Sequence, residues 1–151
     1  MHLTLAFIGD VDDRVAAAAV RALEDAAARI APFRGRLGEA GAFPNDRRPR
    51  VIWIGLAEGA EQVRDAAARV RGALDEQSVP FKDAPPVAHL TIARLRERAT
   101  AADRLAVGAA LAELRGAVPA LAFDVAEAHL FRSVLSPRGP TYTTLARVAL
   151  G

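Results

Sequence analysis

The chain of 151 residues contains no cysteine. This absence excludes a disulfide framework, a thiolate nucleophile and a zinc site with cysteine ligands. No apolar stretch approaches the ~20 residues that a membrane-spanning helix needs. The first residues also lack the charged and then apolar pattern of a secretory leader. We therefore expect a cytoplasmic protein that does not enter a membrane.

Aromatic residues and lysine are also scarce. Aromatics make up 5% of the chain, whereas apolar residues make up 52%. We expect one domain over residues 1–151, with a core rich in small residues and with Trp53 and the six Phe as its bulky members. Lys82 is the single lysine, so arginine carries nearly all the positive charge, and the net charge is +2. Arginine suits phosphate ligands, but a compositional preference for Arg and Ala explains it equally well.

The hydrophobic pattern predicts alternating strands and helices. Strands are expected at 2–8, 33–43 (weak and broken by glycine), 50–56, 88–95, 121–134 and 141–150, and helices at 13–30, 58–77 and 100–115. In the last helix we expect Leu105, Leu111 and Leu114 to face inward. Loops are expected at 44–49 and 135–140. This order predicts an α+β or α/β domain.

An internal repeat stands out from this pattern. HLTLAFIG at 2–9 resembles HLTIARLR at 89–96, and two of the three histidines lie in these copies. Residues i and i+2 of a strand share a face, so each copy presents one imidazole beside one hydroxyl. The four side chains are His2, Thr4, His89 and Thr91. The intervening apolar residues are expected to face a core: Leu3, Leu5, Leu90 and Ile92.

Two histidines and two threonines around one cavity suit phosphate-ester chemistry. Opening a cyclic phosphodiester needs a base for water and an acid for the departing ribose oxygen, and imidazole serves either purpose near neutral pH. Threonine hydroxyls can stabilise charge on the phosphate oxygens. The sequence offers no obvious carboxylate cluster for a metal ion, so none is expected. A single strand histidine is usually structural, but packing gives no reason to repeat a His and a Thr together.

The repeat and several longer stretches resemble the 2H phosphoesterases, in particular the bacterial RNA 2′,3′-cyclic phosphodiesterases, also called LigT-like 2′-5′ RNA ligases. The stretches are PRVIWIGL at 49–56, HLTIAR at 89–94 and HLFRSVLSPRGPTYTTL at 129–145. The resemblance implies an α+β fold of two lobes with pseudo-two-fold symmetry, each an antiparallel sheet with outer helices. It implies hydrolysis of a 2′,3′-cyclic phosphate to a 2′-phosphate, reversible 2′-5′ ligation as a side activity, and no cofactor.

The resemblance also suggests roles for the motif residues. His2 would donate a proton to the leaving oxygen and His89 would be the base for water, although symmetry and reaction direction can exchange these roles. Thr4 and Thr91 would bind phosphate oxygens. Arg94 matches an arginine that follows the second motif in the family and would bind phosphate or substrate. An ideal strand would aim Arg94 at the opposite face, so this role needs a strand end, a twist or a bulge; otherwise Arg94 is a solvated surface residue.

Two aromatic residues are further candidates for substrate binding. Phe7 occupies in the first motif the place that Arg94 occupies in the second, and it could stack on a base or belong to the core. Tyr142, the single tyrosine, follows a loop that lies near the active cleft in the family, and it either contacts substrate or packs. His129 has no threonine two residues later, so it is interpreted as structural.

The chain departs from the family at two places. In relatives a strand and a helix precede the first motif, which here begins at residue 2. Three explanations are open: the start codon is placed too late, the sequence is a shortened piece of the protein, or the strand and helix have really been lost. The expected consequences are an unpaired sheet edge and fraying at His2. The second departure is Ala88, where relatives commonly have proline.

Three functions remain open at this stage. The first is a monomeric, metal-independent phosphodiesterase acting on RNA 3′ ends. The second is a phosphate- or RNA-binding module that has lost its activity. The third is a phosphodiesterase for a small cyclic nucleotide. The loops at 44–49 and 135–140, where specificity would lie, do not choose between RNA and a small nucleotide.

Overall fold

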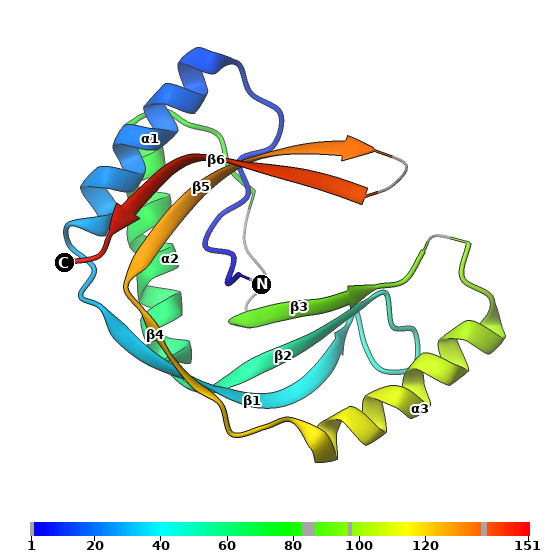
Figure 1. Cartoon of the computed structure of the whole chain (residues 1–151). Helices are drawn as coiled ribbons and strands as arrows, with labels where there is room; N and C mark the ends of the chain where they lie inside the picture. The colour runs from blue at the N-terminus through cyan, green and yellow to red at the C-terminus, as the bar shows by residue number, and fades with distance from the viewer. Residues whose placement is uncertain (1, 83–86, 97, 137–138) are drawn as a thin grey trace. The chain divides into compact units, whose positions relative to one another are not determined.

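The computed structural model of the chain describes residues 2–82, 87–96, 98–136 and 139–151. Three helices and six strands follow one another in the order shown in Figure 1: α1 (Asp13–Ala27), β1 (Phe33–Phe43), β2 (Val51–Glu58), α2 (Ala60–Glu76), β3 (His89–Arg94), α3 (Ala101–Ala117), β4 (Ala122–Val125), β5 (Glu127–Ser136) and β6 (Gly139–Ala149). All three predicted helices are present, and the described strand pairs are antiparallel. The α+β fold class is therefore confirmed.

The chain divides into two compact units. The first, here called the sheet unit, comprises Met1–Thr4, Arg34–Val63 and Pro85–Phe123. The second, here called the hairpin unit, comprises Leu5–Phe33, Arg64–Ala84 and Asp124–Gly151. The expectation of a single domain over 1–151 stays a prediction.

The sheet unit contains a sheet of order β3-β2-β1-β4, with α3 running along it (Figure 1). Its core contains Ala40, Ala42, Ile52, Ile54 and Leu111, so alternate residues of β1 and β2 face the helix. The residues that alternate with these in β1 and β2 point to the opposite face of the sheet.

The predicted inward position of Leu105 is wrong, because this side chain is 77% exposed. Val107 and Leu114 instead pack with Leu111. These three residues follow the three- and four-residue spacing of one helical stripe, whereas a leucine six positions before Leu111 lies well off that stripe.

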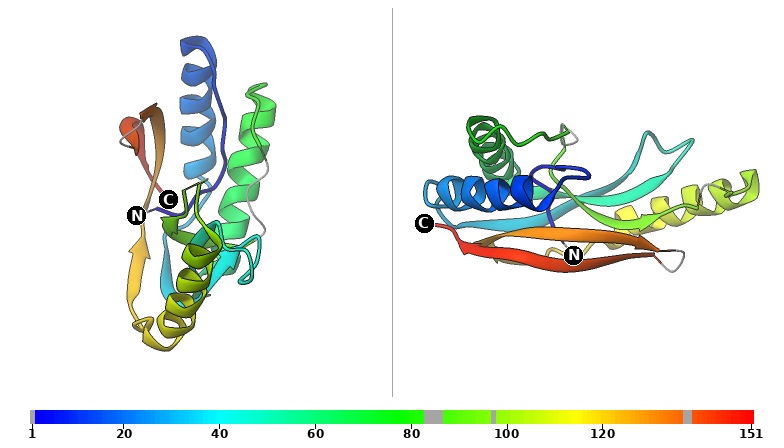
Figure 2. Two further views of the ribbon diagram at one scale, coloured as in Figure 1. Left: turned by 90° about the vertical axis from the view of Figure 1, so that its right-hand side faces the viewer. Right: turned by 90° about the horizontal axis from the view of Figure 1, so that it is seen from above.

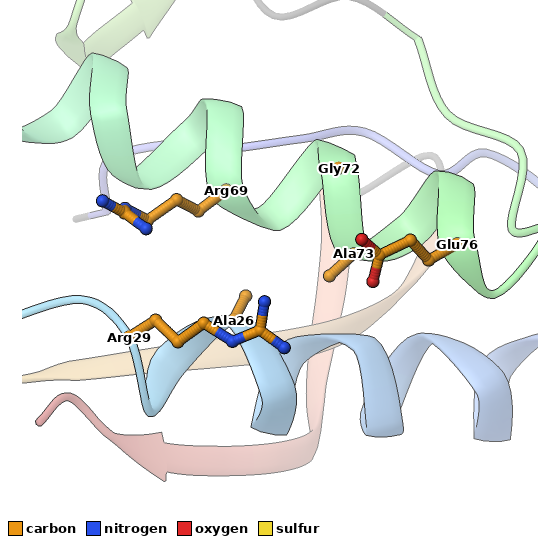
Figure 3. A pocket seen from close by; sticks show the side chains of 6 residues that line it. All are labelled: Ala26, Arg29, Arg69, Gly72, Ala73 and Glu76. Atoms are coloured by element: carbon orange, nitrogen blue, oxygen red, sulfur yellow. The ribbon is translucent and has the colours of Figure 1, made fainter.

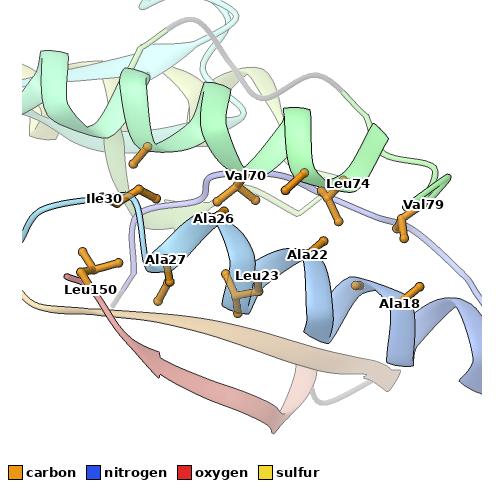
Figure 4. Packing of buried hydrophobic residues seen from close by; sticks show 14 residues of the cluster. Ala18, Ala22, Leu23, Ala26, Ala27, Ile30, Val70, Leu74, Val79 and Leu150 are labelled. Carbon is orange, nitrogen blue, oxygen red and sulfur yellow. The ribbon is translucent and has the colours of Figure 1, made fainter. Parts of the chain in front are cut away.

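The hairpin unit packs α1 against β5 and β6, which form a two-stranded sheet; Figure 2 shows these elements from two further directions. Figure 4 shows its core, where α1 contributes Ala18, Ala22 and Ala26 toward Val70 and Leu74 of α2. Leu23 lies on the other side of α1, toward the hairpin strands, and Leu150 lies at one end of the cluster. Asp12 begins α1 by accepting a hydrogen bond from the Val15 amide at 2.8 Å. The core is rich in alanine, as predicted.

The prediction that Trp53 and the phenylalanines are the bulky members of the core holds only in part. Phe33 and Phe81 are half-buried and pack against the core of the hairpin unit. Trp53 is not among the buried core residues, and Phe7 and Phe131 are 56% and 40% exposed.

Three predicted strand boundaries are also wrong. Residues 2–8 form no strand: Leu3 and Phe7 make isolated bridges to two different partners, Leu90 and Lys82, so no continuous ladder develops. The segment 121–134 is divided at Ala126 into β4 and β5, which join different sheets. The loop expected at 135–140 is shorter, because Leu135 and Ser136 pair with Pro140 and Gly139 across the hairpin. Residues 137–138 lie outside the described part.

The glycines of 33–43 do not break β1, which is continuous over 11 residues. A Cβ at Gly35 would lie 2.7 Å from the Phe123 ring, at Gly38 2.7 Å from the Ala57 amide and at Gly41 2.3 Å from the Trp53 ring. These glycines therefore permit close approach of neighbours rather than ending the strand. Among the described residues, none of the helices has the length and apolar character required to span a bilayer.

Candidate active site

The two histidine motifs lie side by side in the sheet unit. Leu3 forms an antiparallel bridge with Leu90. This bridge brings His2 and Thr4, the neighbours of Leu3 in the chain, close to His89 and Thr91, the neighbours of Leu90. Because side chains alternate along extended chain, all four point to the face opposite Leu3 and Leu90. The repeat thus places two imidazoles and two hydroxyls on one surface.

This surface is the face of the sheet that α3 leaves uncovered. Leu90 pairs with Ile54, which is buried in the core under α3, whereas His89 pairs with Gly55 and Thr91 with Trp53 on the other side. The core therefore anchors one side of β3 while the motif side chains remain accessible. Thr4 is exposed, and His89 and Thr91 are half-buried.

A shift in register brings Arg94 to the same face. Thr91 pairs with Trp53 and Ala93 with Ile52, so Ile92 has no partner in β2. This extra residue is a β-bulge, and it reverses the alternation of the residues after it. Arg94 then pairs with Val51, which shares its face with Trp53. The bulge also explains why Ile92, expected in a core, is 42% exposed.

His89 rests on an aromatic floor formed by Phe43 and Trp53. The His89 ring lies 5.0 Å from the Phe43 ring in an edge-on arrangement and 6.2 Å from the Trp53 ring, and the Phe43 and Trp53 rings are 5.3 Å apart. Packing against two large rings restricts the orientations open to the imidazole. His89 is therefore held in place rather than free to turn in solvent.

A hydrogen bond fixes which nitrogen of His89 can accept a proton. Its Nδ1 lies 2.8 Å from the carbonyl oxygen of Val87. A carbonyl only accepts, so Nδ1 carries the hydrogen and donates it. In the neutral ring Nε2 then bears the lone pair. This is the protonation state that a general base requires.

His2 experiences a different environment. Burial lowers the pKa of His2, and the positive charges of the N-terminal amine and, to a smaller extent, of Arg94 lower it further. The influence of Arg94 agrees with the bulge, since both place the guanidinium on the side of the sheet that carries His2. Two histidines and one arginine thus act on one small region.

We expect Arg94→Gln to raise the pKa of His2, because the substitution removes a positive charge that disfavours the imidazolium. An NMR titration of the His2 ring protons measures this pKa directly. Arg36→Gln is the control: Arg36 is paired with Glu58 at 2.7 Å, toward the other end of β2, and its loss should leave the His2 pKa unchanged. An unaltered pKa in Arg94→Gln would show that the two groups are not neighbours.

The sequence was compared with protein families and with known proteins. Residues 1–136 match the family model described as the 2′-5′ RNA ligase superfamily. The chain belongs to the 2′-5′ RNA ligase superfamily. It is 31% identical to an RNA 2′,3′-cyclic phosphodiesterase of Aquifex aeolicus over 100% of this chain and 78% of that protein. It is 34% identical to one of Aeropyrum pernix over 97% of this chain and 80% of that protein.

Solved structures support the superfamily assignment. A crystal structure of the Thermus thermophilus protein TT0787 superposes with a TM-score of 0.74 at 31% identity, covering 99% of this chain and 77% of that one. Escherichia coli LigT complexed with 3′-AMP gives a TM-score of 0.65 at 26% identity, covering 99% and 76%. The fold predicted from the resemblance is thus shared with solved members of the superfamily.

The remaining predicted site residues of this superfamily member lie in the hairpin unit. Phe7 is exposed, and the Lys82 ammonium lies 5.6 Å from the centre of its ring. Tyr142 is 54% exposed and its ring lies 6.2 Å from that of Phe131. His129, interpreted as structural, stacks on Phe131 and contacts Glu127 at 3.3 Å. The substrate-binding roles of Phe7 and Tyr142 stay predictions.

The sequence reasoning missed Phe43 and Trp53 as residues of the site. A signal for Trp53 is nevertheless present in the sequence. Trp53 lies in PRVIWIGL, one of the stretches shared with the superfamily, and its place between Ile52 and Ile54 puts it on the opposite face from the core. Alternation within this apolar strand therefore indicates that the indole ring belongs to the surface that carries the site.

The hairpin unit contains a hollow of about 180 Å³ between α1 and α2. Arg69, Gly72, Ala73 and Glu76 line it from α2, and Ala26 and Arg29 line it from the end of α1 (Figure 3). Its residues include no histidine or threonine of the motifs.

Proposed function

We propose that this protein hydrolyses the terminal 2′,3′-cyclic phosphate of RNA to a 2′-phosphate through acid–base catalysis by His2 and His89. The observation that supports the proposal is the Leu3–Leu90 bridge, which joins the two His-x-Thr motifs at the residue after each histidine. Membership of the 2′-5′ RNA ligase superfamily and full-length similarity to proteins named RNA 2′,3′-cyclic phosphodiesterase support the substrate.

In this mechanism His89 Nε2 accepts a proton from a water molecule. The water oxygen then bonds to phosphorus while the bond from phosphorus to the ribose O3′ breaks. His2 gives its proton to O3′, which leaves as a hydroxyl, and the phosphate remains on O2′. The hydrogen bond from His89 Nδ1 to Val87 supports the role of base, because it leaves the lone pair on Nε2.

The lowered pKa of His2 is consistent with its role as acid once substrate is bound. Burial and Arg94 favour the neutral ring in the free protein, but the cyclic phosphate brings a negative charge that offsets Arg94 and favours the imidazolium. Arg94, Thr4 and Thr91 bind the non-bridging oxygens and stabilise the charge that develops there.

Both proton transfers are assigned to imidazoles, so no step requires a metal ion or a cofactor. The five proposed catalytic and phosphate-binding residues come from one unit of one chain, and we propose that the enzyme acts as a monomer. Reversible 2′-5′ ligation would follow from the same two proton transfers run backwards. The cytoplasmic location expected from composition stays a prediction.

The test is hydrolysis of an RNA oligonucleotide that ends in a 2′,3′-cyclic phosphate, with EDTA present throughout. We expect turnover to a product whose phosphate is on O2′, which resists enzymes specific for 3′-phosphates. A product with the phosphate on O3′ would reverse the assignment of the leaving oxygen. Loss of turnover in EDTA that a divalent ion restores would contradict the metal-independent mechanism.

A further inference from the structure

Arginines gather at one end of the sheet unit, next to the candidate site. We call five of them the arginine rim: Arg47, Arg48, Arg50, Arg96 and Arg98. All five are exposed. With Arg94, the segments 45–50 and 94–98 contain six arginines and two acidic residues, a formal charge of +4; since the whole chain carries +2, the rest sums to −2. The positive charge of this protein is thus concentrated here.

The two segments of the rim are held together by specific contacts. The Leu95 amide donates to the Arg50 carbonyl at 2.9 Å. The guanidinium of Arg104, on α3, donates to the carbonyl of Pro49 in the first segment at 3.4 Å and to that of Ala99, the residue after the second segment, at 3.5 Å. Pro49 is fully buried below them. The rim is therefore part of the folded unit, not a pair of independent loops.

A local turn presents the first two arginines. The Asn45 side-chain oxygen accepts hydrogen bonds from the Arg47 and Arg48 amides, each at 3.1 Å. Asparagine side chains commonly stabilise turns in this way. The backbone of the turn is thus satisfied locally, which leaves both guanidinium groups available for a ligand.

Two described acidic residues of this region, Asp46 and Asp103, have partners other than the rim. Asp46 is paired with Arg115 at 2.7 Å, and Asp103 accepts hydrogen bonds from the Thr100 amide and hydroxyl at 2.7 and 2.8 Å. None of the five rim arginines forms an ion pair with a carboxylate in the described part of the chain. Glu97 lies outside the described residues. Surfaces built only for solubility usually mix the two signs of charge.

The rim starts at the candidate site and leads away from it. Leu95, which packs against the core under α3, directly follows Arg94 at the end of β3, and Arg96 is the next residue. Arg94 lies close enough to His2 to lower its pKa. A chain of phosphates whose last member occupies the histidine site would therefore meet Arg96 and its neighbours next.

We propose that the arginine rim binds the backbone phosphates of RNA on the 5′ side of the terminal cyclic phosphate. This inference rests on the proposed function of the histidine site. It makes an oligonucleotide, not a cyclic mononucleotide, the preferred substrate, because only an oligonucleotide has further phosphates to contact the rim. Arginine binds phosphate through paired N–H groups, and such contacts supply affinity without reading sequence.

The test compares two substrates in one variant. Arg47, Arg48, Arg96 and Arg98 are replaced together by Gln, and Arg94 is kept. At 0.1 M salt we expect kcat/KM on a cyclic-phosphate RNA dodecamer to fall about tenfold or more, and kcat/KM on 2′,3′-cyclic AMP to change less than about twofold. The parent enzyme should lose affinity for the dodecamer as salt rises. In the variant, the slope of the logarithm of the binding constant against the logarithm of salt concentration should be smaller by about 0.7 for each phosphate contact removed.

A matched control separates local binding from a change in overall charge. The control variant also loses four positive charges, but from outside the rim: Arg14 and Arg21 on α1 and Arg64 and Arg71 on α2 are replaced by Gln. It should keep the parent's preference for the dodecamer. The proposal would be overturned if kcat/KM of the rim variant fell equally on both substrates or on neither. It would also be overturned if the control variant lost as much kcat/KM on the dodecamer as the rim variant. Circular dichroism melting confirms that both variants are folded.

Binding is measured separately so that the result does not depend on turnover. Fluorescence anisotropy with a labelled RNA dodecamer ending in a 2′-phosphate reports on binding without turnover, and the histidine site is the same in the parent and the rim variant. If the parent protein hydrolyses neither substrate, the proposed function fails, but weaker dodecamer binding in the rim variant would still support the rim. If the parent is active and both proteins bind the dodecamer equally, the rim proposal fails and the proposed function stands.

Discussion

Replacing His89 by alanine is expected to lower kcat for hydrolysis of a 2′,3′-cyclic phosphate by about 10³-fold, because removal of a positioned general base typically costs 10²- to 10⁴-fold. The effect should be large since the ring is held by Phe43, Trp53 and the Val87 carbonyl in one orientation. Steady-state assays with a cyclic-phosphate oligonucleotide measure the change. KM should move little, since in the proposed mechanism Arg94 and the threonines, not His89, bind the phosphate oxygens.

His129→Ala is the matched control for this prediction. His129 is the remaining histidine, and its partners are Glu127 and Phe131 in the hairpin unit. We expect the kcat of the His129→Ala variant to stay within about twofold of the parent value. A catalytic loss in His129→Ala as large as that in His89→Ala would show that general effects of losing a histidine, not base catalysis, explain the result. His89→Ala with full activity would exclude His89 as the base.

The sequence predicted the fold class and the motif residues because both depend on local patterns. Helical spacing located α1, α2 and α3, since a stripe of apolar residues at three- and four-residue intervals is a property of the sequence alone. The repeated HLT tripeptide identified His2 and His89 for a similar reason. The two HLT tripeptides can be recognised in the sequence without knowing which strands pair with each other.

The features that the sequence did not predict depend on pairing partners. The position of Arg94 required a bulge, and the bulge at Ile92 is defined only against Trp53 and Ile52 of β2. Likewise the segment 2–8 alternates like a strand, but its two bridges go to different partners. Register is set by the neighbouring chain, so a single segment read by itself could not reveal either outcome.

The aromatic floor under His89 was missed because a chain with 5% aromatics was expected to bury them. The rings of Phe43 and Trp53 instead lie on the histidine face, and the Trp53 Nε1 is buried without a hydrogen-bond partner among the described residues. An unpaired buried N–H costs roughly 1–3 kcal/mol. Retaining the indole despite this cost is consistent with a role in holding His89.

Gly41→Ala tests this floor and should both destabilise the protein and impair catalysis. Gly41 lies directly across from Trp53 in the β1–β2 pairing, and a Cβ there would lie 2.3 to 2.8 Å from atoms of the indole ring. Such overpacking typically costs about 1–3 kcal/mol and forces the larger side chain to move. We expect a lower free energy of unfolding in urea and a kcat reduced by about tenfold, because displaced rings no longer orient His89.

Gly108→Ala makes the same chemical change with the opposite expected sign. Gly108 lies within α3 of the same unit, and the nearest atom to an added Cβ is the Asp46 carbonyl oxygen at 3.9 Å, an ordinary contact. Alanine should therefore stabilise the helix by about 0.5–1 kcal/mol without changing kcat. A Gly41→Ala protein as stable and as active as the parent would show that Trp53 moves aside without consequence for His89.

A second substitution separates the stability of the floor from its role in catalysis. In Gly41→Ala combined with Trp53→Leu, the smaller side chain makes room for the new methyl group, so part of the lost stability should return. Activity should not return, because the leucine side chain would not supply the ring against which His89 packs. Contacting residues are expected to show such non-additive effects. Recovery of kcat together with stability would instead show that His89 needs only a well-packed neighbour, not an aromatic one.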